Sequence, residues 1–184
     1  MSVMAARSVA TAHWQDDESA RPSGPWPIEL RDALESDAAA IHALIAGHLI
    51  EGRLLPRAES EVLRHVRRFV VATGDDRIVA CAELAPLSPR VAEIRSLVVM
   101  EEARNFGVGH ALVDDLIERA AAAGFERVCA FTHVPAFFVR IDFSLVPHAW
   151  LPEKIVTDCR GCDQFRKCGQ YAVMRSLGRR RRAP

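Results

Sequence analysis

A loop with two glycines, placed between an apolar run and an amphipathic run, constrains the fold of this chain most. The run from Ala92 to Met100 is rich in Val, Ile and Leu, which predicts a largely buried strand. The run from about Gly109 to Ala123 has Leu112 and Leu116 at helical spacing, which predicts an amphipathic helix. A strand joined this closely to a helix favours a domain in which helices pack on a sheet.

The rest of the chain continues the alternation of helix and strand patterns. We predict strands at 28–31, 69–73, 77–84, 127–132, 153–157 and 171–177, and helices from Ser36-Asp37 to about 49, at 59–68 and at 135–140. The hairpin strands at 69–73 and 77–84 would turn at Gly74-Asp75-Asp76. The expected fold class is α/β (α+β), a mixed central sheet of about six to seven strands flanked by about four helices.

Length and charge limit the classes of partner. The 184 residues suffice for one domain, which we place at 28–177 between a disordered extension at 1–27 and a basic tail at 178–184. Because 24 basic residues balance 24 acidic ones, a nucleic-acid partner is disfavoured, and Arg179 to Arg182 are interpreted as a solvated tail. No apolar run reaches the ~18 residues of a membrane span, and no secretory apolar segment is visible, so we expect a cytoplasmic protein without membrane partners.

The loop after the strand predicted at 92–100 has the residue types of an anion site. Its glycines would let backbone N–H groups approach a phosphate, and the helix that follows would add its positive end. The loop matches neither a P-loop nor the dinucleotide fingerprint. The alternative is a tight turn that needs glycine for its backbone alone. The candidate anion-binding residues are Arg104, Asn105, Phe106, Gly107, Val108, Gly109 and His110.

This segment resembles motif A of the GNAT acetyltransferase superfamily, in which a strand ending Leu-x-Val leads into R/Q-x-x-G-x-G/A. Other segments resemble the acetyltransferase domain of N-acetylglutamate synthases: Gly52 to Arg57, Ala92 to Val99, Phe137 to Phe143, and Leu151 to Lys154 with Asp158-Cys159. Two positions depart from that family. Asp142 stands where the family has a glycine, which implies a positive φ at some cost, and Ala85 stands where some members have a substrate-facing lysine.

The resemblance implies a GNAT fold, acetyl-CoA as cosubstrate and direct attack of an amine on the thioester. It also implies that the pantetheine arm pairs with the strand edge at Leu97, Val98 and Val99, and that an N–H near Val98-Val99 holds the carbonyl. The favoured acceptor is L-glutamate, as in the first step of arginine biosynthesis. The alternatives are another amine, or a non-catalytic acyl-CoA-binding regulatory module. A homodimer is a possible assembly.

The acid and base inventory is small. We choose Glu93 as the general base because the predicted core strand carries it; the alternative is a solvent-facing strand residue paired with Arg95. The position at which many GNAT enzymes have a tyrosine acid gives Phe137 and Phe138 here, so the thiolate would leave unassisted or take a proton from solvent. The candidate cations for an acceptor carboxylate are Arg57, Arg95 and Lys154, with plain surface charges as the alternative.

Three cysteines lie close together near the end of the chain. The spacing Cys159-x2-Cys162-x5-Cys168 raises the possibility of a structural zinc, whose fourth ligand the spacing does not choose among His148, His133, Cys129 and Cys81. The alternatives are reduced thiols or a disulfide formed on oxidation.

Overall fold

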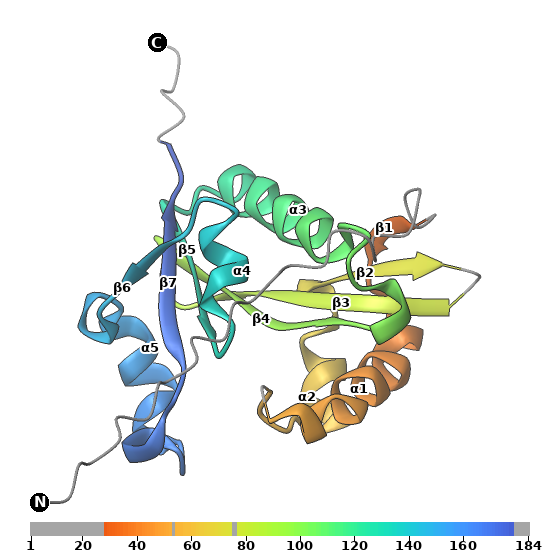
Figure 1. The fold of residues 1–184 in the computed structure, drawn as a ribbon, viewed down its shortest axis with the longest axis horizontal. Coiled ribbons are helices and arrows are strands. Elements are labelled where there is room, and N and C mark those ends of the chain that lie inside the picture. Colours follow the sequence, from red (N-terminus) through yellow and green to blue (C-terminus); the bar gives the residue numbers. More distant parts are fainter. Residues whose placement is uncertain (1–27, 53, 75–76, 179–184) are drawn as a thin grey trace, which may run out of the picture.

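A seven-stranded mixed sheet forms the centre of the molecule, in the order β1-β2-β3-β4-β5-β7-β6 (Figure 1). The computed structural model describes residues 28–52, 54–74 and 77–178. The predicted N-terminal extension, the basic run from Arg179, Arg53 and Asp75-Asp76 of the hairpin turn lie outside these ranges. The strands are β1 (Glu29–Asp32), β2 (Phe69–Gly74), β3 (Arg77–Pro86), β4 (Val91–Val99), β5 (Arg127–Thr132), β6 (Ser144–Val146) and β7 (Tyr171–Ser176).

Helices cover both faces of this sheet, which confirms the predicted α/β class and strand number. Figure 1 shows α3 (Val108–Ala122) over one face, and α1 (Ala38–Gly47) with α2 (Glu59–Arg64) over the other. Two shorter helices, α4 (Pro135–Val139) and α5 (Pro152–Thr157), follow β5 and precede β7. The described ranges therefore hold five α-helices, where about four were expected.

The central strand β3 is buried on both sides because each face carries a helix. Ala80 and Ala82 belong to the apolar cluster under α3, together with Leu112 and Leu116, whereas Cys81 belongs to the cluster under α1 and α2. Burial on both faces explains the continuous run of small and apolar residues in this strand. Glu83, which follows Ala82, is the exception, because it is charged and buried.

The strands β4 and β5 separate about half-way along β4. They pair in parallel only from Val91 to Ile94, although β4 continues to Val99 and β5 to Thr132. Just beyond Ile94, the register with β3 shifts so that Ser96 and Leu97 together face Ala82, and Ser96 has a φ of 49°. This geometry is a β-bulge, which bends the strand and releases backbone groups from the ladder. The sheet thus opens next to a bulge.

The strand predicted at 153–157 is wrong, because these residues form α5. Pro152 takes the first helical position, where its fixed φ and missing N–H suit a helix start, and Glu153 adds an acidic side chain to the first turn. The apolar pair Ile155-Val156 is too short to distinguish a strand from a helix. The strand before β7 is instead β6, a three-residue edge strand that the sequence reading did not find.

The departure at Asp142 behaves as predicted, because this residue has a φ of 66°. Replacing it with glycine should raise the free energy of unfolding by roughly 0.5 to 1 kcal/mol, since the relief of the left-handed strain exceeds the added entropy of the unfolded chain. Urea unfolding would measure the change. The matched control is Asp114→Gly on the exposed side of α3, which should instead destabilise by a few tenths of a kcal/mol. A loss of stability at position 142 would contradict the strain argument.

Candidate active site

The glycine loop ends in the first turn of α3 and points backbone donors outward. Asn105 and Gly107 have positive φ values of 67° and 82°, and Gly107 is the N-cap of the helix. The first intrahelical bond runs from Ala111 N–H to the Gly107 carbonyl, at 3.0 Å. The N–H groups from Val108 to His110 therefore have no acceptor within the helix. A Cβ on Gly107 would meet none of the described residues within 4 Å, which leaves space over the turn. These features fit a pyrophosphate.

The loop is packed against the end of β4, next to the opening of the sheet. A Cβ on Gly109 would lie 3.5 Å from the Phe137 ring and 3.6 Å from Val99 Cγ2. His110 meets the same ring edge-on, with 5.4 Å between the centroids. The Phe137 side chain therefore packs at the start of α3.

Arg104 is fixed by the protein itself. Its Nε donates to the Val99 carbonyl at 3.0 Å and its Nη2 donates to Glu51 Oε1 at 2.6 Å, with 37% of the side chain exposed. The Val99 carbonyl thus points away from β3, and in an antiparallel ladder the N–H of the same residue points the same way. This free edge of β4 is where the pantetheine arm was expected. A contact between Arg104 and phosphate stays a prediction.

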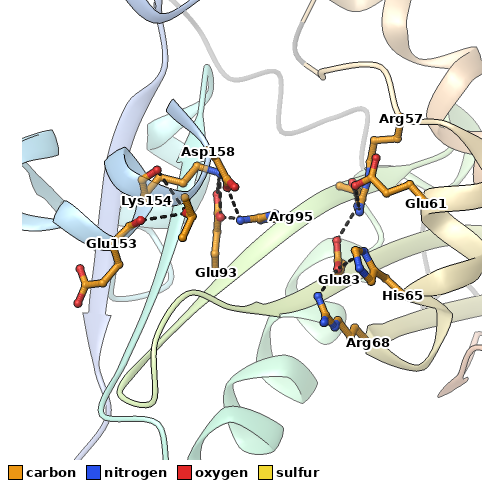
Figure 2. Close-up of polar contacts among 12 residues, drawn as sticks. Arg57, Glu61, His65, Arg68, Glu83, Glu93, Arg95, Glu153, Lys154 and Asp158 are labelled. Carbon is orange, nitrogen blue, oxygen red and sulfur yellow. Dashed lines mark hydrogen bonds and ion pairs between the residues drawn. The ribbon is translucent and has the colours of Figure 1, made fainter. Parts of the chain in front are cut away.

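Glu93 lies at the centre of a four-residue cluster, hereafter the Lys154 cluster, with Arg95, Lys154 and Asp158 (Figure 2). Lys154 Nζ lies 2.8 Å from Glu93 Oε1 and 2.9 Å from Oε2, and Arg95 Nε donates to Oε2 at 2.6 Å. Asp158 completes the cluster by accepting from Lys154 at 2.8 Å and from Arg95. The predicted pairing of Glu93 with Arg95 is therefore present, but Glu93 is 2% exposed and does not face solvent.

The charges of this cluster compensate one another. Burial opposes the ionisation of Asp158, but the hydrogen bond from Lys154 and the charges of Lys154 and Arg95 prevail, so its pKa is lowered. Burial likewise opposes the charge on Arg95, yet Glu93 and Asp158 raise its pKa. The cluster thus brings together three residues that the sequence predicted separately and adds Asp158, whose role the sequence did not suggest.

A second buried acid, Glu83 on β3, was missed by the sequence reading. Its Oε2 accepts from Arg57 Nη1 at 2.5 Å. Among the described residues its Oε1 has no hydrogen-bond partner; Arg68 Nη1 lies 3.8 Å and His65 Nδ1 3.9 Å from it (Figure 2). An unsatisfied oxygen on a fully buried carboxylate calls for a ligand or a water. The signal in the sequence was a single acid inside the apolar run from Ile78 to Leu84.

Arg57 lies in this second cluster and presents its donors to protein acceptors. Its Nε and Nη2 donate to Glu61 Oε1 at 3.0 and 2.7 Å, and its Nη1 also donates to Ser96 Oγ at 3.0 Å. With 9% of its side chain exposed, Arg57 joins the segment before α2 to the bulge in β4. Its role as a carboxylate ligand stays a prediction.

A cavity of about 320 Å³ lies beside the Lys154 cluster. Lys154 and Asp158 line it together with His148 and Gln170, and the rest of its wall is apolar or carries sulfur. The remaining lining residues are Leu55, Phe131, Ile155, Cys159, Cys162, Phe165 and Cys168.

The suggested zinc site is not formed. Across the ranges that the structure describes, no three His, Cys, Asp or Glu side chains converge as metal ligands. Cys159, Cys162 and Cys168 are free thiols that all line the cavity, and Cys168 is exposed.

Comparisons with known proteins agree with this geometry. A profile of the Acetyltransferase (GNAT) family matches residues 11–140. The chain belongs to the GNAT acetyltransferase family. It is therefore an N-acetyltransferase with the GNAT fold that the motif predicted. No helix within the described residues is long and apolar enough to cross a membrane.

Several acetyltransferases are similar to this chain in sequence or in fold. An uncharacterised N-acetyltransferase of Chlorobaculum tepidum is 32% identical over 148 residues, which cover 80% of this chain and 96% of that one. The amino-acid acetyltransferase of Mycobacterium tuberculosis is 31% identical over 78% of this chain and 83% of its own length. The N-acetylglutamate synthase of Neisseria gonorrhoeae, solved with coenzyme A and N-acetyl-glutamate, superimposes with a TM-score of 0.75 at 26% identity. The superposition covers 83% of this chain and 35% of that one.

The open space over Gly107 generates a test of the loop. Gly107→Trp should lose CoA affinity by more than about tenfold, because the indole would occupy the phosphate position, and the positive φ should cost about 1 to 2 kcal/mol of stability. Gly109→Ala is the matched control, since its methyl group meets only ordinary contacts and should leave the affinity within about threefold. Calorimetric titration with CoA would measure both variants, with urea unfolding to show that they fold. Unchanged affinity in the Gly107 variant would exclude this loop as the pyrophosphate site.

Proposed function

We propose that this enzyme acetylates the α-amino group of an amino acid, with L-glutamate as the favoured acceptor and arginine biosynthesis as its pathway. The observation that carries the proposal is the Lys154 cluster, which holds two cations beside a cavity at the point where the sheet opens. The relatives named as amino-acid acetyltransferases and N-acetylglutamate synthase support the acceptor class. The expected cytoplasmic location and homodimer stay predictions.

The Lys154 cluster is already organised to bind a carboxylate. Arg95 and Lys154 both donate to the Asp158 carboxylate, which comes from a different element than Arg95 and borders the cavity. An acceptor carboxylate that enters the cavity could take the place of Asp158 without creating an unpaired buried charge. Glu93 would keep both cations in position, because it also binds each of them.

Two acids compete for the role of general base. Glu93 pairs with Ala85 and Cys129 in the part of β4 where the sheet is closed, and cations occupy both of its oxygens. Glu83 lies opposite Arg95, next to the bulge and the opening, and one of its oxygens has no hydrogen-bond partner in the part of the chain that the structure describes. Position and availability therefore favour Glu83 as the group that accepts the proton from the amine, directly or through water.

The remaining steps follow from the backbone around the opening. Acetyl-CoA supplies the thioester carbonyl that the amine attacks. Backbone N–H groups between the bulge and Val99 would donate to the carbonyl oxygen, where negative charge develops. The neighbouring rings of Phe137 and Phe138 offer no acidic proton, so we propose that the thiolate takes its proton from solvent.

The cavity also favours a second candidate acceptor. Leu55, Phe131, Ile155 and Phe165 give it a largely apolar wall, which suits an amine with an apolar group better than a second carboxylate. Ala85 carries no charge, whereas some members of the N-acetylglutamate synthase family, which this chain resembles, have a substrate-facing lysine at this position. An N-acetyltransferase for another amine is therefore the alternative.

Release of thiol from acetyl-CoA tests the acceptor. We expect turnover with L-glutamate, at least about tenfold slower turnover with L-glutamine and D-glutamate, and none above background with a polyamine, because the cations select a correctly placed carboxylate. The matched variant is Lys154→Met, which should raise the KM for glutamate more than the KM for acetyl-CoA. Preference for an apolar amino acid would support the second candidate, and preference for a polyamine would overturn the amino-acid assignment.

Paired substitutions separate the two possible bases. Glu83→Gln should lower kcat by roughly 10²-fold or more with little change in the KM for acetyl-CoA, whereas Glu93→Gln should mainly raise the KM for the acceptor. Steady-state kinetics would measure both variants, and CoA binding would show that each is folded. The opposite pattern would return the role of base to Glu93.

A further inference from the structure

Three thiols gather on one wall of the acceptor cavity. Cys159, Cys162 and Cys168 all line it, and all come from the segment between α5 and β7. Cys159 and Cys162 are partly exposed and Cys168 is exposed. The proposed acetyl transfer uses none of them.

The three thiols lie on or at the ends of two adjoining turns that border the same cavity. The pKa of Cys159 is raised, mainly by burial, against the opposing charge of Lys154, and both Cys168 and Cys162 lie near enough to contribute. Cys162 N–H donates to the Cys159 carbonyl at 3.1 Å, so a single tight turn joins these two residues. The turn that follows, Phe165–Lys167, packs against the Cys159–Gly161 turn and carries Cys168 at its end.

The same segment is joined to the charged cluster. Asp158, which binds Lys154 and Arg95, is the residue directly before Cys159. Lys154 lies one helical turn earlier on α5, and it lines the cavity as Cys159 does. A covalent bond at Cys159 would therefore restrain the Asp158 carboxylate and narrow the cavity at the same time.

We propose that Cys159 and Cys168 form a redox-sensitive modification site, in which a hydroperoxide joins them in a disulfide that slows acetyl transfer. The proposal rests on the proposed function for its effect on rate. The Cys168 thiolate, being exposed, attacks the peroxide oxygen and becomes a sulfenic acid, with release of water when the peroxide is hydrogen peroxide. Cys159 sulfur then attacks the Cys168 sulfur and displaces a second water. Two thiols and one hydrogen peroxide thus give one disulfide and two waters.

The other two cysteines of the chain provide an internal contrast. Cys81 and Cys129 are buried in the core. Burial raises the pKa of the Cys81 thiol to about 12, and it also raises that of Cys129. Because the thiolate is the reactive form, both should stay reduced under mild oxidation.

The test treats the folded protein with hydrogen peroxide and compares single variants. Wild type should lose 2 Da and two of its five thiols, with a peptide map that joins Cys159 to Cys168. Its acetyl-transfer rate should fall by about tenfold or more and recover with dithiothreitol, since small displacements in a site cost rates of this order. The rate of Cys162→Ser should fall after peroxide as that of wild type does. Cys159→Ser and Cys168→Ser should each have the same rate after peroxide as before it.

Several results would overturn the proposal. One is a loss of rate after peroxide in the Cys159 and Cys168 variants that equals the loss in wild type. The others are a disulfide that leaves the acetyl-transfer rate unchanged, and oxidation that maps to Cys81 or Cys129. The mass and the thiol count require no acceptor amine. A protein that forms the disulfide but acetylates no amino acid would therefore contradict the proposed function and the effect on rate, while the thiol chemistry itself would stand.

Discussion

The separation of β4 from β5 after Ile94 is the constraint on which the rest of this structure depends. Up to Ile94 the two strands satisfy each other's backbone groups, and beyond it the free edge of β4 needs another partner. The bulge at Ser96-Leu97 keeps β4 paired with β3 while it turns that edge toward the opening. If the pantetheine arm pairs with this edge, as the resemblance implies, the cofactor would complete the sheet. The loop at Gly107 and the two acid clusters are arranged around this opening.

The two buried carboxylates near the opening, Glu83 and Glu93, are both paired with cations. Removing one member of such a pair leaves an uncompensated charge, at a cost of about 3 to 5 kcal/mol. Within the described residues, each of the three candidate cations has a carboxylate partner, so none of them is isolated. They are Arg57, Arg95 and Lys154. The proposed acceptor carboxylate would therefore bind by exchange with an internal one, and Asp158, at the end of a short helix, is the carboxylate of the Lys154 cluster that lines the cavity.

The sequence predicted what local patterns determine. Periodicity identified the hairpin of β2 and β3, the core strand β4, helix α3 and its loop, since each of these has one strong local signal. It failed at α5, where Pro152 and Glu153 favour a helix over the short apolar pair that follows. The pairing of Glu93 with Lys154 spans 61 residues, and no local pattern encodes such a contact. Glu83 was missed because its importance comes from burial and from its place beside the bulge, which only the assembled sheet reveals.

The segment from α5 to β7 connects these observations. Leu151 is completely buried, so the start of α5 is firmly attached, whereas the cysteine-bearing turns beyond Asp158 are largely exposed. Lys154 and Asp158 lie between the rigid start and the more exposed turns, four residues apart on the same helical face. A change in the turns therefore reaches the charged cluster through Asp158, while the buried start of the helix keeps Lys154 in place. Of the two cations that contact Glu93, only Lys154 comes from this segment. Arg95, on β4, would still hold Glu93 if the segment were displaced. A displacement of the segment should therefore change acceptor binding more than it changes the opening between β4 and β5.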